Sequence, residues 1–233
     1  MKKHIPNTIT CCNLLCGCIA VSFALQAEPR YDLALAFIII GNVFDFFDGF
    51  AARLLRVASP VGKELDSLAD VVTSGLAPAS MLFALLREMP PAAGGFVGPY
   101  LPYAAFLITA FSALRLAKFN LDQRQTSSFI GLPTPANALF WGALIVGNHA
   151  WFCQNPWSAW LLLAGVLLSC WLLVAELPMF ALKFKHFRWN GNALRYTFIL
   201  VSAALLILLG WTAFSAIVLV YVIASIIAEL QKK

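Results

Sequence analysis

Charged residues are scarce in this sequence. Asp, Glu, Lys and Arg make up 12% of its 233 residues, hydrophobic residues make up 61%, and the mean hydropathy is +0.81. Soluble globular domains carry about 25% charged residues. Polar stretches long enough for a soluble domain are also missing. The composition therefore excludes a soluble enzyme or binding module and predicts a protein embedded in a bilayer.

Cysteine pairs with metal-binding spacing are missing as well. None of the six cysteines forms a C-x-x-C pair, and four of them lie in the first hydrophobic run. This pattern favours reduced cysteines that act as small apolar side chains, and it excludes a zinc finger or a disulfide framework. The histidines His4, His149 and His186 belong to no recognisable motif, so none is nominated as a ligand.

Apolar runs fill most of the chain. Because a spanning helix needs about 20 mostly apolar residues, we predict an all-α integral membrane protein with one membrane-embedded domain, residues 1–233. It would be a bundle of about eight transmembrane helices, a six-helix core plus two. The expected helices are residues 9–26, 31–54, 64–87, 99–117, 133–152, 158–181, 194–209 and 212–229.

Basic residues fall almost entirely in alternate polar breaks. Of the 16 Lys and Arg residues, only Arg30 and Arg87 lie in the other breaks. Since cytoplasmic loops carry the Lys and Arg excess, both termini and the breaks after the second, fourth and sixth helices are predicted to be cytoplasmic. This bias accounts for the net charge of +5 and indicates no nucleic-acid partner.

The stretch DFFDGFAARLLRVASPVGKELDSLAD places four aspartates in apolar surroundings. Asp45 and Asp48 lie about 60° apart on one helix, and Asp66 and Asp70 are one turn apart on the next. A short turn joins the two helices, so the two acidic faces are expected to converge near the cytoplasmic ends. Carboxylates at such close range repel one another unless cations are bound between them.

Oxygen ligands without histidine or thiolate select hard cations such as Mg²⁺, Mn²⁺ or Ca²⁺. Two such cations stabilise the attacking and leaving oxygens of phosphoryl transfer. Gly49, Ala52 and Gly62 leave the acidic faces uncovered, and Arg53 suits a phosphate or carboxylate. Interhelical salt bridges are one alternative. A cation-coupled transporter is another, although transporters usually place such charges near the midplane between two related halves.

Written as a pattern, the stretch is D-x2-D-G-x2-A-R-x8-G-x3-D-x3-D, and it resembles the signature of the CDP-alcohol phosphatidyltransferases. The resemblance implies two divalent cations, Mg²⁺ or Mn²⁺, both bound by Asp45 and Asp66, the first also by Asp48 and the second also by Asp70. It further implies that Asp70 is the catalytic general base. Residues implied to line the CDP-lipid site are Gly49, Ala52, Arg53, Ser59 and Gly62. Ser59 equally fits a turn residue beside Pro60.

The amino-terminal stretch IPNTITCCNLLCG resembles the opening of the same family, P-N-x2-T-x2-N-x3-G. Asn7 and Thr10 fit capping residues at a helix start. The resemblance implies a contact with the nucleotide as their second role. The active-site hairpin is expected to span residues 41–75.

The acceptor alcohol must be read from another segment. Residues 115–138, RLAKFNLDQRQTSSFIGLPTPANA, resemble the R-L-A-R-F-N and F-x-G-L-P-x-P-A patterns of the bacterial membrane-bound phosphatidylserine synthases, a branch of this family. Lys118 stands where that pattern has its second Arg. Two prolines and Gly131 make a stiff helix start whose backbone groups need partners in a cavity. Residues nominated for the acceptor or for phosphate are Arg115, Lys118, Asn120 and Ser128, of which Arg115 and Lys118 equally fit ordinary loop cations.

The resemblance thus implies a homodimeric enzyme of the bacterial inner membrane with its active site on the cytoplasmic side. It would transfer the phosphatidyl group of CDP-diacylglycerol to the hydroxyl of L-serine and release CMP. The nearest alternative keeps this chemistry and uses glycerol 3-phosphate or an inositol phosphate as the acceptor.

Overall fold

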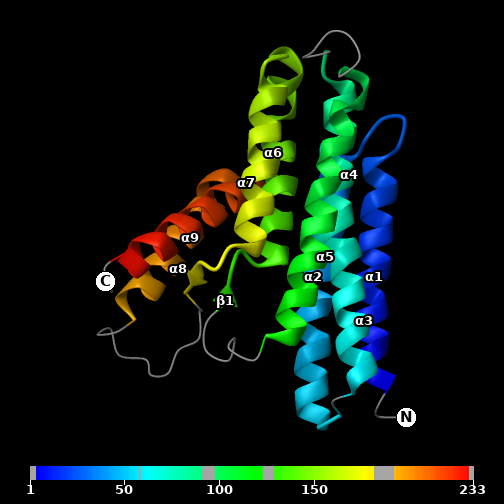
Figure 1. Ribbon diagram of the computed structural model, residues 1–233, viewed down its shortest axis with the longest axis vertical. Helices are drawn as coiled ribbons and strands as arrows, with labels where there is room; N and C mark the ends of the chain where they lie inside the picture. Colours follow the sequence, from blue (N-terminus) through cyan, green and yellow to red (C-terminus); the bar gives the residue numbers. More distant parts are fainter. Residues whose placement is uncertain (1–3, 58, 91–97, 123–128, 181–191, 231–233) are drawn as a thin grey trace.

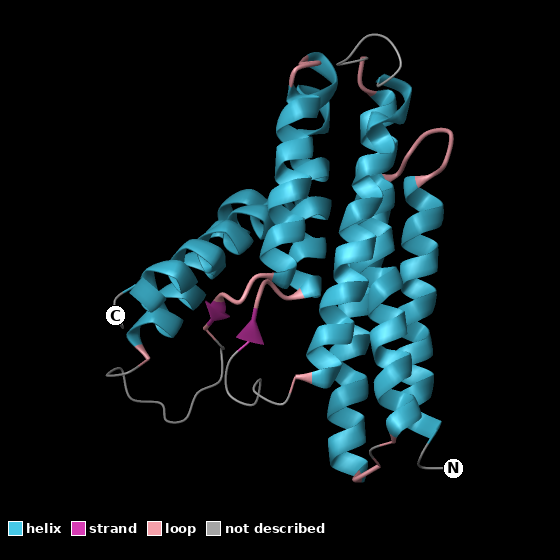
Figure 2. Cartoon of the chain, viewed as in Figure 1, coloured by secondary structure: helices cyan, strands magenta, loops and turns pink. Residues whose placement is uncertain are grey.

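The computed structural model describes residues 4–57, 59–90, 98–122, 129–180 and 192–230. These residues are almost entirely helical, and a short two-stranded antiparallel sheet is the exception (Figure 2). The predicted all-α class is confirmed. The elements are α1 (His4–Ala24), α2 (Tyr31–Leu55), α3 (Pro60–Asp70), η1 (Val71–Leu76), α4 (Ala77–Glu88), η2 (Gly98–Phe106), α5 (Leu107–Leu121), β1 (Phe129–Ile130), α6 (Thr134–Gln154), α7 (Ser158–Val174), β2 (Pro178–Met179), α8 (Ala193–Leu209), η3 (Gly210–Thr212) and α9 (Ala213–Leu230).

The helices α1 to α7 run side by side as a long bundle, and α8 and α9 lean away from it at one side (Figure 1). α1 packs along α2, and a Cβ at Gly41 of α2 would lie only 2.9 Å from the Asn13 side-chain oxygen and 3.3 Å from the Cys16 Cβ atom of α1, so glycine permits the close approach of the two helices. Trp141 of α6 is buried, and its indole N–H donates to the hydroxyl of Ser169 on α7 at 3.0 Å. Large apolar side chains such as Leu35, Ile38 and Met81 fill much of the remaining interior.

One continuous helical run, Pro60–Glu88, carries two of the predicted aspartates through the bundle. It consists of α3, the π-helical turn η1 and α4. In an apolar 18-residue stretch of this run, 72% is buried inside the structure, compared with 11% for the corresponding stretch of Ala193–Leu230. π-helical turns are frequent at functional sites, and η1 begins directly after Asp70. The most buried of the candidate spans therefore positions half of the acidic stretch.

Among the described residues, five helical stretches are long and apolar enough to cross a membrane. They are His4–Ala24, Tyr31–Leu55, Pro60–Glu88, Gly98–Leu121 and Ala193–Leu230. The total of about eight spans and the cytoplasmic position of the termini stay predictions. The bundle has two ends. The α2–α3 end is where Leu55 and Pro60 lie, and the α4–α6 end is where Glu88 and Gln154 lie.

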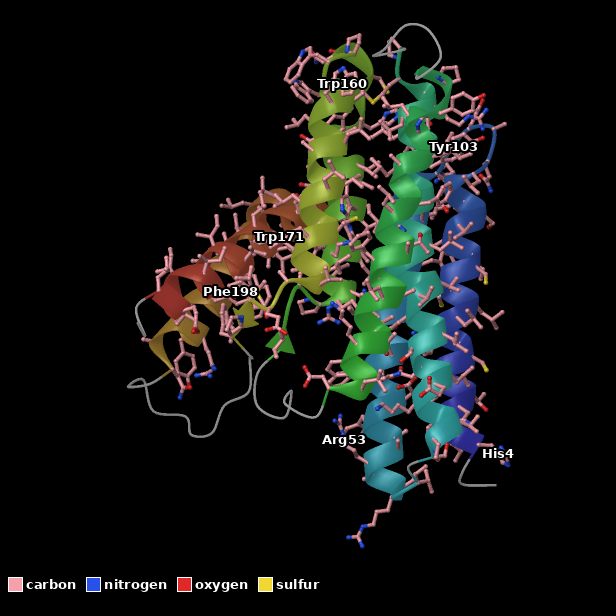
Figure 3. The ribbon with its side chains drawn as sticks, in the orientation of Figure 1. His4, Arg53, Tyr103, Trp160, Trp171 and Phe198 are labelled. Carbon is pink, nitrogen blue, oxygen red and sulfur yellow. The ribbon has the colours of Figure 1, made fainter. Side chains whose placement is uncertain are left out.

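Labelled side chains mark the two ends of the bundle. His4 and Arg53 lie at the α2–α3 end, whereas Tyr103 and Trp160 lie at the α4–α6 end (Figure 3). Both of these aromatic side chains are exposed, by 58% and 50% respectively. Exposed aromatic residues are enriched where a membrane meets water, so this end fits an interfacial position.

Two predicted helix boundaries were wrong. The first helix begins at His4 and not near residue 9, because Pro6 in the first turn is compatible with a helix. Asn7 and Thr10 therefore lie inside α1 and do not cap it. The sixth predicted helix, residues 158–181, ends at Val174, and Pro178 starts β2 instead, since the residue before a proline disfavours the helical conformation.

The sequence predicts that the backbone groups at the start of α6 need hydrogen-bond partners. They find them at the end of α7. The amides of Gly131 and Leu132 donate to the carbonyls of Leu177 and Leu172, both at 2.9 Å. Gly131 has a φ of +75°, and a Cβ there would lie 2.8 Å from the Leu173 carbonyl oxygen. Glycine is therefore needed at this turn, which ties α6 to α7 beside β1 and β2.

Candidate active site

The turn between α2 and α3 is tightly built. Arg56 follows α2 in the left-handed conformation with a φ of 53°. The Ser59 hydroxyl accepts a hydrogen bond from the Gly62 amide at 3.0 Å, and Pro60 occupies the first turn. Ser59 is thus the N-cap of α3. Both helices pack against α1, which brings the two ends of the acidic stretch to the same side of the molecule.

Three of the four aspartates come together across this hairpin. Asp45 and Asp48 of α2 and Asp66 of α3 each offer a carboxylate oxygen, and these oxygens lie within 4.8 Å of one another. Asp70 lies one turn further along α3 and outside this group of three. Asp48 and Asp70 are only 6% and 8% exposed. The expected convergence of the two acidic faces is confirmed for Asp45, Asp48 and Asp66.

Polar side chains of α1 hold two of these carboxylates. The Thr10 hydroxyl donates to Asp48 at 2.6 Å, and the Asn13 side-chain amide donates to Asp70 at 3.2 Å. The Thr73 hydroxyl of η1 donates to the Asn13 backbone carbonyl at 3.0 Å. A Cβ at Gly17 would lie 2.5 Å from the Thr73 hydroxyl oxygen, so glycine permits this close contact. The amino-terminal motif therefore positions the acids.

The cluster fits a divalent cation. The Asp66 Oδ1 atom is buried and has no hydrogen-bond partner among the described residues. An orphaned carboxylate oxygen is costly to bury unless a positive charge compensates it. All of the donor atoms are carboxylate oxygens, the ligand type preferred by Mg²⁺ and Mn²⁺. Both observations agree with the cofactor that the sequence predicts.

A groove opens beside the cluster. Its volume is about 230 Å³. Six of the seven residues nominated for the CDP-lipid line it, together with Asp48 and Asp66; the six are Asn7, Thr10, Gly49, Ala52, Ser59 and Gly62. A Cβ at Gly49 would meet nothing within 4 Å, so Gly49 faces open space. A Cβ at Gly62 would lie 3.0 Å from the side-chain oxygens of Asn7 and Ser59.

Arg53, the seventh nominated residue, does not line the groove. Its side chain is exposed near the α2–α3 end of the bundle (Figure 3). From this position it can meet a headgroup or phosphate from the water side.

The residues nominated for the acceptor are placed differently from one another. Arg115 of α5 is 7% exposed, while Lys118 is exposed, and both line a hollow of about 300 Å³ with β1 and the end of α7. Asn120 is already engaged, since its side-chain amide donates to Ser67 at 2.9 Å and its carbonyl accepts from Lys63 at 2.8 Å. Ser128 lies outside the described residues.

Buried polar atoms without a partner mark Arg115, which the sequence nominates, and two residues of α6 that it does not nominate. The Nε and Nη2 atoms of Arg115 have no hydrogen-bond partner among the described residues. The same holds for the Thr134 hydroxyl and both side-chain atoms of Asn137, which are almost fully buried at the start of α6. Asn137 stands directly after the P-x-P-A pattern, which was the available signal.

The structure is thus a bundle of helices of which several are apolar enough to cross a membrane, with a cluster of carboxylates that could hold a cation beside a groove. The family model described as CDP-alcohol phosphatidyltransferase matches residues 3–172. A CDP-diacylglycerol–serine O-phosphatidyltransferase of Bacillus subtilis is 36% identical over 186 residues, covering 80% of this chain and 92% of the relative. Proteins of the same name from Mycobacterium leprae and Helicobacter pylori are 30% and 26% identical, covering 93% and 95% of this chain and 71% and 89% of the relatives.

The chain belongs to the CDP-alcohol phosphatidyltransferase family. The resemblance seen in the residue pattern is thereby confirmed, and with it the class of enzyme. The family match includes α1 to α6 and most of α7, but neither α8 nor α9. This division agrees with the bundle, because α8 and α9 lean away from it (Figure 1).

Proposed function

We propose that this protein transfers the phosphatidyl group of CDP-diacylglycerol to the hydroxyl of L-serine and releases CMP. The observation that carries the proposal is the meeting of Asp45, Asp48 and Asp66 at the wall of a groove. The names of the relatives support the choice of substrates.

The four aspartates have the role of metal ligands in this proposal. Asp45 and Asp66 would contact two divalent cations, Mg²⁺ or Mn²⁺, with Asp48 on the first and Asp70 on the second. When bound, such cations neutralise the pyrophosphate and the charge that develops at phosphorus. Thr10 and Asn13 keep Asp48 and Asp70 in position through their hydrogen bonds. Preorganised ligands need no rearrangement during the reaction.

Asp70 also has the role of general base. It would accept the proton of the serine hydroxyl as the serine oxygen bonds to the lipid-side phosphorus and the bond to the CMP oxygen breaks. Arg115 lies close enough to Asp70 to interact electrostatically. A guanidinium whose Nε and Nη2 atoms have no partner among the described residues suits the serine carboxylate. Arg115, with Thr134 and Asn137 as further polar groups, is therefore our candidate acceptor site, and Asn120 is the weaker candidate.

The CDP-lipid would occupy the groove that Asn7, Thr10, Gly49, Ala52, Ser59 and Gly62 line, with Arg53 at its water side. Open space at Gly49 lets the ligand approach the backbone of α2. Ser59 would serve both as the cap of α3 and as part of the groove wall.

An acceptor screen tests the proposal. The purified protein in detergent receives CDP-diacylglycerol and Mg²⁺ or Mn²⁺, with serine, glycerol 3-phosphate or an inositol phosphate added separately. CMP release and the lipid product are measured. We expect release that depends on serine and yields phosphatidylserine. Release with a phosphorylated acceptor alone would reassign the acceptor, and no release with any of them would refute the proposed reaction.

The α2–α3 end is proposed to face the cytoplasm of a bacterial inner membrane. Arg53, Arg56 and Lys63 lie at this end, and Arg87 lies near the other, as the positive-inside rule requires. The homodimer stays a prediction, and the mass of the protein in a lipid nanodisc tests it.

A further inference from the structure

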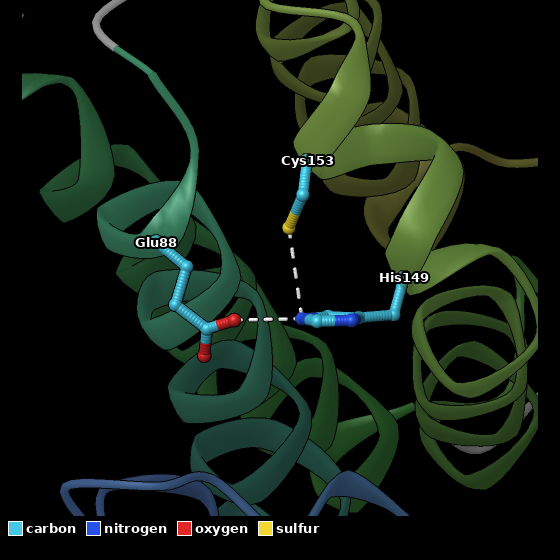
Figure 4. Close-up of side chains that lie close together, drawn as sticks. All are labelled: Glu88, His149 and Cys153. Carbon is cyan, nitrogen blue, oxygen red and sulfur yellow. Dashed lines mark hydrogen bonds and ion pairs between the residues drawn. The ribbon is translucent and has the colours of Figure 1, made fainter.

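A second group of metal-ligating side chains lies at the α4–α6 end. Glu88 is the last residue of α4, and His149 and Cys153 are one turn apart on α6 (Figure 4). Each of the three offers one ligand atom within 4.8 Å of the others. We propose that Glu88, His149 and Cys153 form a binding site for a borderline divalent cation, Zn²⁺, separate from the acidic cluster.

The geometry converges on one nitrogen atom. The His149 Nε2 atom lies 2.6 Å from Glu88 Oε2 and 3.6 Å from Cys153 Sγ. A neutral imidazole nitrogen has either one proton or one lone pair, so Nε2 satisfies one of these neighbours at a time. A cation placed among the three atoms uses all of them at once.

The distances suit zinc after a small movement. With Zn–N and Zn–O distances of about 2.0–2.1 Å and a Zn–S distance of about 2.3 Å, tetrahedral coordination places nitrogen and sulfur roughly 3.6 Å apart and nitrogen and oxygen roughly 3.3 Å apart. The observed nitrogen–sulfur distance of 3.6 Å already agrees. The Glu88 oxygen would retreat by roughly 0.7 Å, a movement that a terminal, partly exposed carboxylate can make.

Tyr31 supports the ligand set from a third helix. Its hydroxyl donates to Glu88 Oε1 at 2.7 Å, so it leaves Oε2 for the ligand site. Its ring also lies against the His149 imidazole, with 5.3 Å between ring centroids. Such hydrogen bonds to a metal-binding carboxylate orient it and commonly change affinity by about 10- to 100-fold.

The donor set and its exposure decide which ion is taken. One thiolate, one imidazole and one carboxylate favour Zn²⁺ over Mg²⁺ or Ca²⁺, which prefer oxygen alone. The side chains of His149 and Glu88 are 40% and 30% exposed, so an ion can reach them from outside the bundle. On binding, the Cys153 thiol releases its proton to solvent. A water molecule would complete the tetrahedron.

The two sites are far apart. Asp70 and Glu88 lie on the same helical run, 18 residues from one another, which corresponds to roughly 25 Å along the axis. A zinc ion at the α4–α6 end would therefore join α4 to α6 without entering the acidic cluster. This inference does not depend on the proposed reaction.

Metal binding to the purified full-length protein tests the site. Excess Mg²⁺ occupies the acidic cluster, and Zn²⁺ is then added in equilibrium dialysis with elemental analysis. Co²⁺ replaces Zn²⁺ in a parallel sample, because a cobalt–thiolate bond has a charge-transfer absorption band. We expect one Zn²⁺ per chain and this band in the unmodified protein. Cys153→Ser should abolish the band, and His149→Ala and Glu88→Gln should each weaken binding at least about tenfold.

Tyr31→Phe and Cys18→Ser complete the set. Tyr31→Phe should weaken binding by about 10-fold or more while the cobalt–thiolate band persists. Cys18 is exposed on α1, and its replacement by Ser should change neither measurement. Equal zinc binding by Cys153→Ser, His149→Ala and the unmodified protein would overturn the site. A cobalt–thiolate band that survives in Cys153→Ser but disappears in Cys18→Ser would overturn it as well.

Discussion

The two ends of the bundle hold ligand groups that differ in chemistry and in origin. At the α2–α3 end, three carboxylates from one hairpin meet beside a groove. At the α4–α6 end, a carboxylate, an imidazole and a thiol meet from two helices, and Glu88 and His149 are 61 residues apart in the sequence. The first set offers oxygen to hard cations, and the second offers mixed ligands to zinc.

The side chains of the two clusters also differ in burial. Asp48 and Asp70 are nearly inaccessible and are held by α1, whereas Glu88 and His149 are partly open to the outside. A buried charge set is expensive to keep without function, while an exposed set has little cost. Of the two clusters, the acidic one is therefore the more enclosed, and its carboxylates are held in place as preorganised chemistry on a phosphate requires.

Asp66→Asn should reduce the activity more than any other substitution considered for the acidic cluster. It removes a charged ligand whose Oδ1 atom has no other partner, so CMP release should fall by roughly a thousandfold, since one lost electrostatic contact in a preorganised site costs about 2.7–4 kcal/mol. The rate is measured with saturating Mg²⁺ and again with Mn²⁺.

Glu64→Gln is the matched control for Asp66→Asn, because Glu64 is exposed on the same helix. Its rate should equal that of the unmodified protein. Asp66→Asn should also keep its zinc binding at the α4–α6 end. If Glu64→Gln loses as much activity as Asp66→Asn, the loss reflects general charge and the cluster has no special role.

Arg115→Lys tests whether Arg115 binds the acceptor. It keeps the charge but loses the planar fork, so the KM for serine should rise about 10- to 100-fold, because hydrogen bonds to charged groups contribute about 1.5–3 kcal/mol. The KM for CDP-diacylglycerol should change little. Lys118→Gln alters an exposed residue of the same hollow, so its effect should be smaller. Equal shifts in both KM values would argue against an acceptor role.

Gly49→Ala tests whether the groove holds the CDP-lipid. An added methyl meets nothing in the protein, and alanine favours a helix over glycine by about 1 kcal/mol, so Tm should hold or rise. The KM for CDP-diacylglycerol should nevertheless rise roughly tenfold, equivalent to about 1.4 kcal/mol.

Gly17→Ala should change the Tm in the opposite direction to Gly49→Ala. The new methyl would overlap the Thr73 hydroxyl and backbone, and overpacking of this kind costs about 1–3 kcal/mol of stability. Its Tm should therefore fall. An unchanged KM for CDP-diacylglycerol in Gly49→Ala would show that the lipid does not occupy this part of the groove.

Helical periodicity is why the α2–α3 end could be predicted from the sequence. Asp45 and Asp48 share a face, as do Asp66 and Asp70, and one turn returns the chain on itself, so local rules suffice. The bounds of α2 differ from the prediction of 31–54 by one residue. His149 and Cys153 share a face of α6 by the same rule, but only tertiary packing brings Glu88 of α4 to them, so no local rule predicts the group of three. Thr134 and Asn137 lie in or next to the P-x-P-A pattern, but the pattern does not show that their polar atoms are buried without a partner.

Tyr31→Phe in the absence of zinc should have only a small effect on the stability of the fold. The change removes the hydrogen bond to Glu88 and keeps the ring against His149, so the free energy of unfolding should fall by only about 1 kcal/mol. Tyr103→Phe, at the same end but exposed, is the control and should have no effect. Zinc should then raise the Tm of the unmodified protein more than that of Tyr31→Phe, because the phenylalanine leaves the Glu88 carboxylate free to turn away from the ion. An equal rise in both would mean that Tyr31 does not orient the ligand.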